Sequence, residues 1–386
     1  NELGIDYATI GNNEGIGLAK DELDCLYEKA KFQPIIGNLK DEGRQPEWAK
    51  PYLIHKTKAG TNIAFLAYTF PYYITYAPNG WQVLEPMARL EEDLARPEVR
   101  DADIVVVLSH LGVRYDEQIA ETYPQVNLVI GSHTHHLFEE GRLVNETYLA
   151  AADRYGYYLG CIDLTVKNGQ LIECQIEAIP TKSYILDLDK EDEAFIKAMR
   201  EEGHRRLAQK KVANLGRELD FDETCQLVLQ AVCQETHSQL TLLNTGLIMK
   251  TLGPQVTMAD LQEALPHQMR IARLVVTGQE LKEICQEVFT KAELLKNQAI
   301  KGMGFRGKTF GEVITGNFAY KNGNLLYNRR VVDSNEKFSL VLVDQYYFAS
   351  YFPTIKEKEV TLLFPDLLRE LVAKYLGKNG ANWDKI

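Results

Sequence analysis

The sequence lacks the features that mark several special classes of protein. It has no apolar run near the roughly 18 residues that cross a membrane. It has no low-complexity tract and no repeat with a period of about 20–50 residues. These absences exclude a membrane-spanning helix and a repeat solenoid, and they leave an ordinary globular protein.

Cysteine is scarce and has no metal-type spacing. The six cysteines are Cys25, Cys161, Cys174, Cys225, Cys233 and Cys285, and none forms a C-x-x-C pair. Their spacing does not resemble a disulfide scaffold, so we expect mostly buried free thiols. A hairpin turn at Asn168-Gly169 would allow Cys161 and Cys174 to face each other.

Positive charge is scarce in the first half of the chain. Residues 1–186 contain 16 Lys and Arg against 27 Asp and Glu, whereas residues 187–386 contain 27 of each. Binding to a nucleic acid polymer needs clustered Lys and Arg, so the acidic half argues against such a partner. It suits a half that holds metal cations, although a solvated acidic surface explains the charge equally well.

The start of the sequence resembles the interior of a domain. It does not begin with Met, and "NELGIDYATIG" is typical of a helix end, a Gly4 cap and a strand. We therefore expect a segment to be missing upstream.

The length of 386 residues predicts two domains. In residues 1–186, apolar strands such as "TNIAFLAYTF", "DIVVVLSH" and "VNLVIGS" alternate with polar, helix-forming stretches and end in a hairpin, which indicates a layered α/β domain. Residues 187–216 are charged and helical, as in an interdomain connector. Residues 217–386 show a second α/β pattern, which includes the predicted strand "FSLVLVDQYYF".

Metal-capable side chains follow three strands of the first half. Asn12 and Asn13 follow "DYATIG", His110 ends "DIVVVLSH", and His133 follows "VNLVIGS", with His135 two residues later. In α/β sheets, sites gather beyond the carboxyl ends of strands, and imidazole and amide oxygen ligate Zn²⁺ or Mn²⁺. A surface loop explains any one histidine, but three strand ends with the same pattern favour a metal site.

The motifs "GNNEG", "LSHLG" and "GSHTHH", in that order, resemble those of the calcineurin-like metallophosphoesterases. The second half, with "NTGLIMK", "VTMADLQEALP" and "TGQELK", resembles the C-terminal domain of the 5′-nucleotidase and UDP-sugar hydrolase family. The resemblance implies a four-layer α/β/β/α metallophosphoesterase domain with an incomplete start, followed by an α/β substrate-binding domain. It covers essentially the whole chain.

The same resemblance implies a site with two divalent ions, Zn²⁺, Mn²⁺ or similar, that activate a hydroxide. By position, Asn12, His110 and His133 would ligate one ion, and His135 would reach the other. The family's upstream D-x-H and G-D segments are absent from this sequence. We therefore expect two ions in a complete protein and one or none in this chain, with poor turnover.

In the family, two aromatic rings of the second domain hold the nucleobase. Phe305 matches one ring, and Phe348 or else Tyr346 matches the other, although a core or hinge role explains Phe305 equally well. Asn244 and Gly246 of the N-x-G segment are the other expected substrate-binding residues.

Three positions depart from the family pattern. Asn13 replaces the catalytic His, Ile16 replaces the Asp that pairs with that His, and Met249 replaces an Arg that grips an anion. These changes indicate an altered mechanism and a drifted substrate. The nearby arginines Arg270, Arg273 and Arg306 are candidates to replace the lost cation.

The leading hypothesis is a metal-dependent phosphohydrolase that acts on a nucleotide or a related small phosphoester. The alternative is a catalytically silent nucleotide-binding protein on the same fold, and a third is a hydrolase of non-phosphate esters. We expect a small-molecule partner, no nucleic acid polymer and no membrane span. Free cysteines favour the cytoplasm over export, and the sequence leaves the oligomeric state open.

Overall fold

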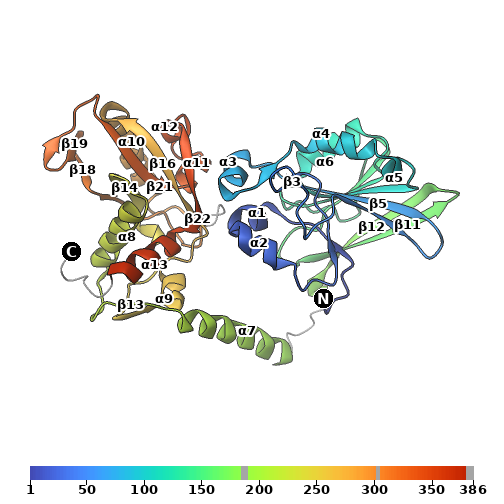
Figure 1. Cartoon of the computed structure of the whole chain (residues 1–386), viewed down its shortest axis with the longest axis horizontal. Helices are drawn as coiled ribbons and strands as arrows, with labels where there is room; N and C mark the ends of the chain where they lie inside the picture. Colours follow the sequence, from blue (N-terminus) through green and yellow to red (C-terminus); the bar gives the residue numbers. More distant parts are fainter. Residues whose placement is uncertain (184–189, 301–304, 380–386) are drawn as a thin grey trace. The chain divides into compact units, whose positions relative to one another are not determined.

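The structure is a computed structural model that describes residues 1–183, 190–300 and 305–379. The chain divides into two compact units, Asn1–Asp189 and Lys190–Ile386. Both are assemblies of helices and sheets, which confirms the predicted α/β class (Figure 1). Helix α7 (Lys190–Gln209) occupies most of the predicted connector and is grouped with the second unit; residues 187–189 lie outside the described residues.

The first unit is built on a six-stranded sheet with the order β4-β5-β7-β8-β10-β9. Its strands are β4 (Tyr52–Lys56), β5 (Asn62–Thr69), β7 (Ile104–His110), β8 (Leu128–Gly131), β9 (Arg142–Val144) and β10 (Thr147–Ala150). Short strands β1 (Tyr7–Ala8), β2 (Gln33–Pro34), β3 (Leu39–Lys40) and β6 (Gln82–Val83) pair separately as β1-β2 and β3-β6. The helices are α1 (Asn12–Gly17), α2 (Lys20–Leu26), α3 (Tyr73–Tyr76), α4 (Pro86–Leu94), α5 (Pro97–Arg100) and α6 (Val113–Thr122).

The register of this sheet brings the predicted strand ends together. Strands β5, β7 and β8 are parallel, with Thr69 beside His110 and Ser109 beside Gly131. The central strands are almost continuously apolar because both of their faces are buried. The carboxyl ends of these strands therefore share one edge, where His110 and the segment after Gly131 meet.

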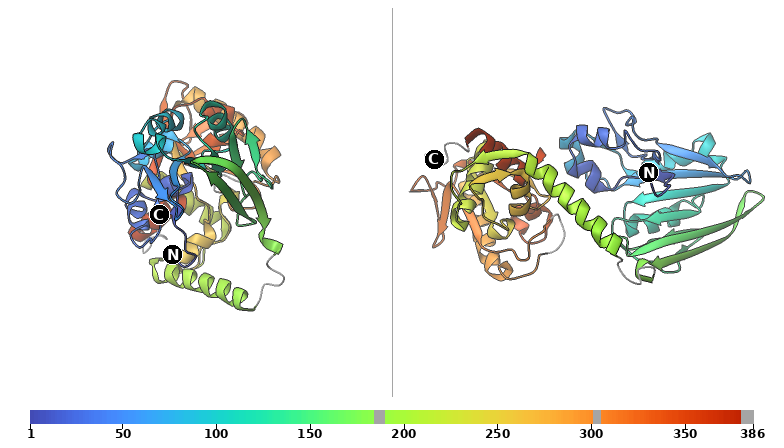
Figure 2. Two further views of the ribbon diagram at one scale, coloured as in Figure 1. Left: turned by 90° about the vertical axis from the view of Figure 1, so that its right-hand side faces the viewer. Right: turned by 90° about the horizontal axis from the view of Figure 1, so that it is seen from below.

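Different elements cover the two faces of the sheet (Figures 1 and 2). Leu90 of α4 and Ile119 of α6 pack with Leu66 and Val107 of the sheet in one core cluster. The hairpin of β11 (Tyr158–Lys167) and β12 (Gln170–Pro180) contributes apolar side chains to a second cluster that contains Val106. The sheet thus lies between a helical layer and a β layer.

The predicted hairpin turn is confirmed at Asn168 and Gly169, which both have positive φ. The expectation that its two cysteines face each other is wrong. Cys161 is paired with Glu177 and Cys174 with Leu164, so the two thiols lie on opposite faces of the ribbon. All six cysteines are free.

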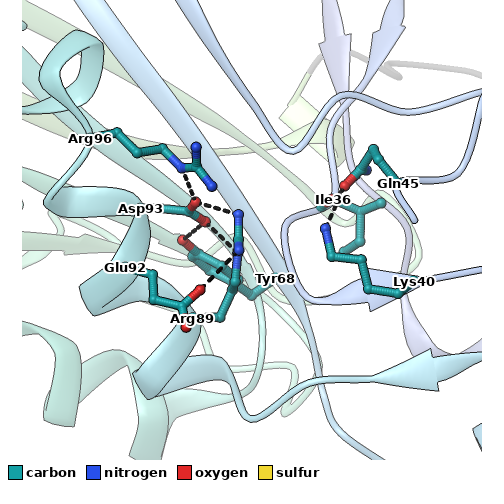
Figure 3. Close-up of polar contacts among 8 residues, drawn as sticks. All are labelled: Ile36, Lys40, Gln45, Tyr68, Arg89, Glu92, Asp93 and Arg96. Carbon is teal, nitrogen blue, oxygen red and sulfur yellow. Dashed lines mark hydrogen bonds and ion pairs between the residues drawn. The ribbon is translucent and has the colours of Figure 1, made fainter. Parts of the chain in front are cut away.

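A buried carboxylate anchors helix α4 to the sheet (Figure 3). The Asp93 side chain is fully buried and accepts hydrogen bonds from Tyr68 Oη at 3.0 Å, from Arg89 Nη2 at 2.5 Å and from Arg96 Nε at 2.8 Å. Arg89 also contacts Glu92, which is 67% exposed. Two cations and a hydroxyl compensate the desolvation of this carboxylate, so removing it leaves Arg89 buried without its main partner.

Replacing Asp93 by Ala is expected to lower the free energy of unfolding of the first unit by about 3–5 kcal/mol. Glu92→Ala is the matched control, because it removes an exposed partner of the same Arg89 and should cost less than about 1 kcal/mol. Urea unfolding followed by tryptophan fluorescence measures both, since Trp48 and Trp81 pack against each other in this unit. Equal effects of the two variants would contradict the anchoring role.

The second unit is built on a five-stranded sheet with the order β17-β14-β21-β16-β22. Its strands are β14 (Leu240–Asn244), β16 (Arg270–Thr277), β17 (Val313–Gly316), β21 (Lys337–Val343) and β22 (Val360–Leu367); smaller sheets hold β13 (Lys211–Asn214), β15 (Gln255–Thr257), β18 (Phe318–Lys321), β19 (Asn324–Tyr327) and β20 (Arg330–Val331). The remaining helices are α8 (Phe221–Glu235), α9 (Met258–Ala264), α10 (Gly278–Leu295), α11 (Gln345–Phe348), α12 (Pro353–Lys356) and α13 (Leu368–Asn379). Buried hydrophobic side chains of this unit's helices and strands form one core cluster.

The predicted strand "FSLVLVDQYYF" is only partly correct. Strand β21 ends at Val343, and residues 345–348 form the short helix α11, whose last amide donates to Asp344 O. Among the described residues, no helix combines the length and apolar character that a membrane crossing requires.

Candidate active site

Asn12 reaches the strand edge because helix α1 begins there. The Glu14 carboxylate accepts a hydrogen bond from Gly11 N at 2.7 Å and so caps the helix, which gives a structural role to a residue without an assigned function. A Cβ on Gly11 would lie 2.8 Å from Cε1 of His110. Glycine is therefore needed for the close approach of α1 to this imidazole.

The orientation of His110 is fixed by a serine that the sequence analysis missed. Ser132 Oγ donates to Ser109 O at 3.0 Å and lies 2.8 Å from His110 Nδ1. A serine hydroxyl has one proton, so His110 Nδ1–H must donate to Ser132 Oγ. Burial, followed by the charges of His133 and His135, lowers the pKa of His110 to about 4. The ring is thus neutral at pH 7, with its lone pair on Nε2.

Three potential metal ligands converge at this edge. Asn12 Oδ1 lies 2.9 Å from His110 Nε2 and 3.0 Å from His133 Nδ1, and the two ring nitrogens are 3.3 Å apart. Burial and His135 also lower the pKa of His133. Because His110 carries its proton on Nδ1, a ring proton between these atoms would require the Nδ1–H tautomer of His133, whereas a metal ion would require its Nε2–H tautomer.

The spacing of the three donors fits a metal ion. Ligands about 2.0–2.2 Å from one ion lie roughly 3.0–3.5 Å from one another. Residues 1–183, 190–300 and 305–379 contain no group of three His, Cys, Asp or Glu side chains that could hold a metal, and the cluster here consists of two imidazoles and one amide oxygen. Imidazole with amide oxygen suits Zn²⁺ or Mn²⁺.

His133 and His135 occupy strained backbone. Their φ angles are +65° and +56°, in the left-handed region that non-glycine residues rarely adopt. Thr134, between them, accepts a hydrogen bond from Val113 N at 3.0 Å and contacts His136 Nδ1 at 2.9 Å, which ties the turn to helix α6. Such strain persists where the surroundings impose it, and it concentrates at functional sites.

His135 and Asn13 lie beside the three converging donors and not within them. His135 is exposed, and its ring centroid lies 6.5 Å from that of Tyr155. Asn13 is exposed on α1, next to Asn12. Their predicted roles, as ligand of a second ion and as occupant of the catalytic His position, stay predictions.

In the second unit, Asn244 and Gly246 hold a loop in place. Asn244 Nδ2 donates to Phe310 O at 2.5 Å, and Gly246 N donates to the same carbonyl at 3.0 Å. A Cβ on Gly246 would lie 2.1 Å from Thr309 O, so only glycine permits this contact. Both residues position the loop that follows Phe305, and Asn244 is fully buried.

Two of the three aromatic candidates are buried. Phe305 is 5% exposed and stacks on His267 with 4.9 Å between ring centroids. Tyr346 is fully buried, packs between Phe310 and Phe352, and donates to Asn244 Oδ1 at 3.0 Å. Tyr346 therefore has no ring face open to a ligand in this structure.

Phe348 is the partly exposed member of the three aromatic candidates. Its ring makes an edge contact with that of Tyr347, at 5.3 Å between centroids. Of the expected pair of rings, Phe348 is thus the one with accessible surface.

The sequence is 34% identical over 394 residues to the uncharacterised metallophosphoesterase YunD of Bacillus subtilis, which covers 97% of this chain and 84% of that protein. The chain belongs to this metallophosphoesterase family. It is also 21% identical over 357 residues to the 5′-nucleotidase of Vibrio cholerae, covering 75% of this chain and 63% of the enzyme. No family model matches the sequence.

The metallophosphoesterase assignment agrees with the fold. A Staphylococcus aureus protein described as a 5′-nucleotidase, solved with α-ketoglutarate, superposes with a TM-score of 0.59 at 15% identity, covering 99% of this chain and 82% of that one. The two-domain 5′-nucleotidase fold predicted from the motifs is therefore confirmed. The family consists of phosphoester hydrolases, so membership gives the class of enzyme and leaves the substrate open.

The three arginines that the sequence offers in place of the family's Arg differ in accessibility. Arg270 is buried, donates to Pro365 O and lies 4.2 Å from the ring centroid of Phe364. Arg273 donates to Thr236 O. Arg306 is exposed, which makes it the most accessible of the three cations predicted for this metallophosphoesterase.

Sequence reasoning missed a fourth arginine, Arg369. Its Nη1 donates to His267 O at 3.1 Å, and burial lowers its pKa. Nothing in the local sequence pattern relates residue 369 to residue 267, because the contact depends on helix α13 returning to the loop between α9 and β16.

His267 makes the stability of this metallophosphoesterase depend on pH. It is fully buried, its Nδ1 accepts from Arg306 N at 2.9 Å, and its Nε2 donates to Leu247 O at 2.9 Å. Burial lowers its pKa to about 4. As the pH falls, His267 is therefore protonated at a higher pH in the unfolded chain than in the folded chain. The free energy of unfolding falls as the pH drops from about 6.5 towards 4.

We expect His267→Gln to reduce the loss of unfolding free energy between pH 7 and pH 5 by about 2 kcal/mol. Urea unfolding followed by circular dichroism at both pH values measures this difference, and the exposed His237→Gln serves as control. An unchanged pH dependence in the His267 variant would contradict a buried, neutral imidazole.

Proposed function

We propose that the chain is a divalent-metal-dependent phosphohydrolase of nucleotides or related small phosphoesters. The convergence of Asn12 Oδ1, His110 Nε2 and His133 Nδ1 within 2.9–3.3 Å supports it most strongly. Asn12, His110 and His133 would hold one ion, and His135 would face a second. A bound divalent ion would polarise a phosphoryl oxygen and offset its charge.

The residues of the chain would orient the site and bind the substrate. Ser132 keeps the Nε2 lone pair of His110 directed at Asn12. Asn13, in place of a catalytic histidine, can donate an amide hydrogen bond to an oxygen of the substrate but cannot transfer a proton. The proposal therefore includes a preference for esters whose leaving oxygen needs no protonation.

In the second unit, we assign Phe348 and Arg306 to contacts with the organic part and the charge of the substrate. Asn244 and Gly246 would act indirectly, since they hold the loop after Phe305. The cytoplasmic location stays a prediction.

The test is hydrolysis of p-nitrophenyl phosphate, a nucleoside monophosphate and a sugar nucleotide, with Mn²⁺ or Zn²⁺ and with a chelator. We expect activity that requires metal, and weaker metal binding by calorimetry in His110→Ala. Ser132→Ala should lose roughly 10- to 100-fold in metal affinity, because it removes the partner that orients His110.

His136→Ala is the matched control, since this exposed histidine lies in the same turn but outside the converging donors. Metal binding without turnover of any phosphoester would favour the silent binding protein. No metal binding in the parent chain would contradict the proposal.

A further inference from the structure

An aromatic wall adjoins the converging donors in the first unit. The ring of Phe70 stacks on that of His133, with centroids 4.9 Å apart and planes at 19°. Tyr72 packs on Phe70 at 4.7 Å and contacts His133 edge-on at 6.1 Å. Tyr115 of helix α6 meets the same Phe70 edge-on at 6.0 Å. The wall therefore contacts a proposed metal ligand directly.

Backbone contacts fix this wall to the strand edge. Phe70 follows strand β5, and its amide donates to His110 O at 2.9 Å. Tyr72 O accepts from the amides of Thr75 and Tyr76, which begins helix α3. The position of the rings is thus set by the same strand ends that carry the proposed ligands.

The wall continues to an exposed surface. Tyr73 is 51% exposed and Ile74 is 43% exposed. Burial raises the pKa of Tyr73, and the charges of Glu85 and Tyr115 raise it further. The residues that follow the wall in the chain thus offer solvent an apolar side chain and a phenol ring.

We propose that Phe70, Tyr72 and Tyr73 bind a flat, uncharged aromatic group of the substrate while its phosphoryl group occupies the adjoining site. This inference rests on the proposed phosphohydrolase function. Aromatic rings favour a flat π system through stacked or edge-to-face contacts. The rings of the wall are uncharged, so the wall suits a phosphomonoester of a neutral aromatic moiety.

The contrast with the second unit supports this assignment. There, Phe305 and Tyr346 are buried in the core, and Phe348 is the partly exposed ring. The first unit instead places two partly exposed rings, Phe70 and Tyr72, against His133. Specificity for the organic group would then come at least in part from the unit that holds the metal.

Binding of phenylphosphonate and methylphosphonate, measured by calorimetry with Mn²⁺ present, tests this inference. The two probes carry the same phosphonate and differ in the aromatic ring. The parent chain should bind phenylphosphonate more tightly than methylphosphonate. Tyr73→Ala and Tyr72→Leu should each reduce the ratio of these two affinities roughly 2- to 10-fold. Tyr73→Ala should leave the affinity for methylphosphonate and for Mn²⁺ unchanged.

Phe221→Ala, at an exposed ring on helix α8, is the control and should keep the preference. Equal affinity of the parent chain for both probes, or equal weakening of both in the wall variants, would overturn the inference while leaving the proposed function intact. Binding of neither probe, together with no hydrolysis, would overturn both.

Discussion

One hydrogen bond decides what the strand edge of the first unit can do. His110 Nδ1 donates to Ser132 because the hydroxyl proton of Ser132 is already donated to Ser109 O. The Nε2 lone pair of His110 must then face Asn12 Oδ1. Lone pairs that face each other at such distances repel unless a proton or a cation lies between them. The facing lone pairs of His110 and Asn12 therefore favour a bound cation at this edge.

The sequence predicted that Asn12, His110 and His133 come together, and the structure shows this convergence. Residues 110 and 133 are far apart in the chain, but they follow parallel strands whose carboxyl ends share one edge, so their approach could be foreseen. Asn12 reaches the same edge at the start of helix α1, which follows β1 of a separate two-stranded sheet. The α/β class and the hairpin at Asn168-Gly169 follow from equally local patterns. The role of Ser132 was not foreseen, because it depends on which acceptor receives the single hydroxyl proton of this serine.

Burial accounts for most of what the sequence could not predict. Phe305, Tyr346 and Asn244 matched a family pattern, but a pattern does not reveal which aromatic ring of a loop turns inward. The buried contacts between Asn244, Tyr346 and Phe310 O are long-range in sequence. The stacking of Phe70 on His133 is also long-range, although the aromatic run after β5 was visible in the sequence.

The central claim is that Asn12, His110 and His133 bind a divalent ion together, and X-ray absorption spectroscopy of the zinc-loaded chain tests it most directly. The account predicts one bound ion with imidazole scattering from two histidines and oxygen ligands at about 2.0–2.2 Å. His110→Ala should remove one imidazole from the spectrum. A shell of oxygen alone, or a spectrum unchanged in that variant, would contradict the account.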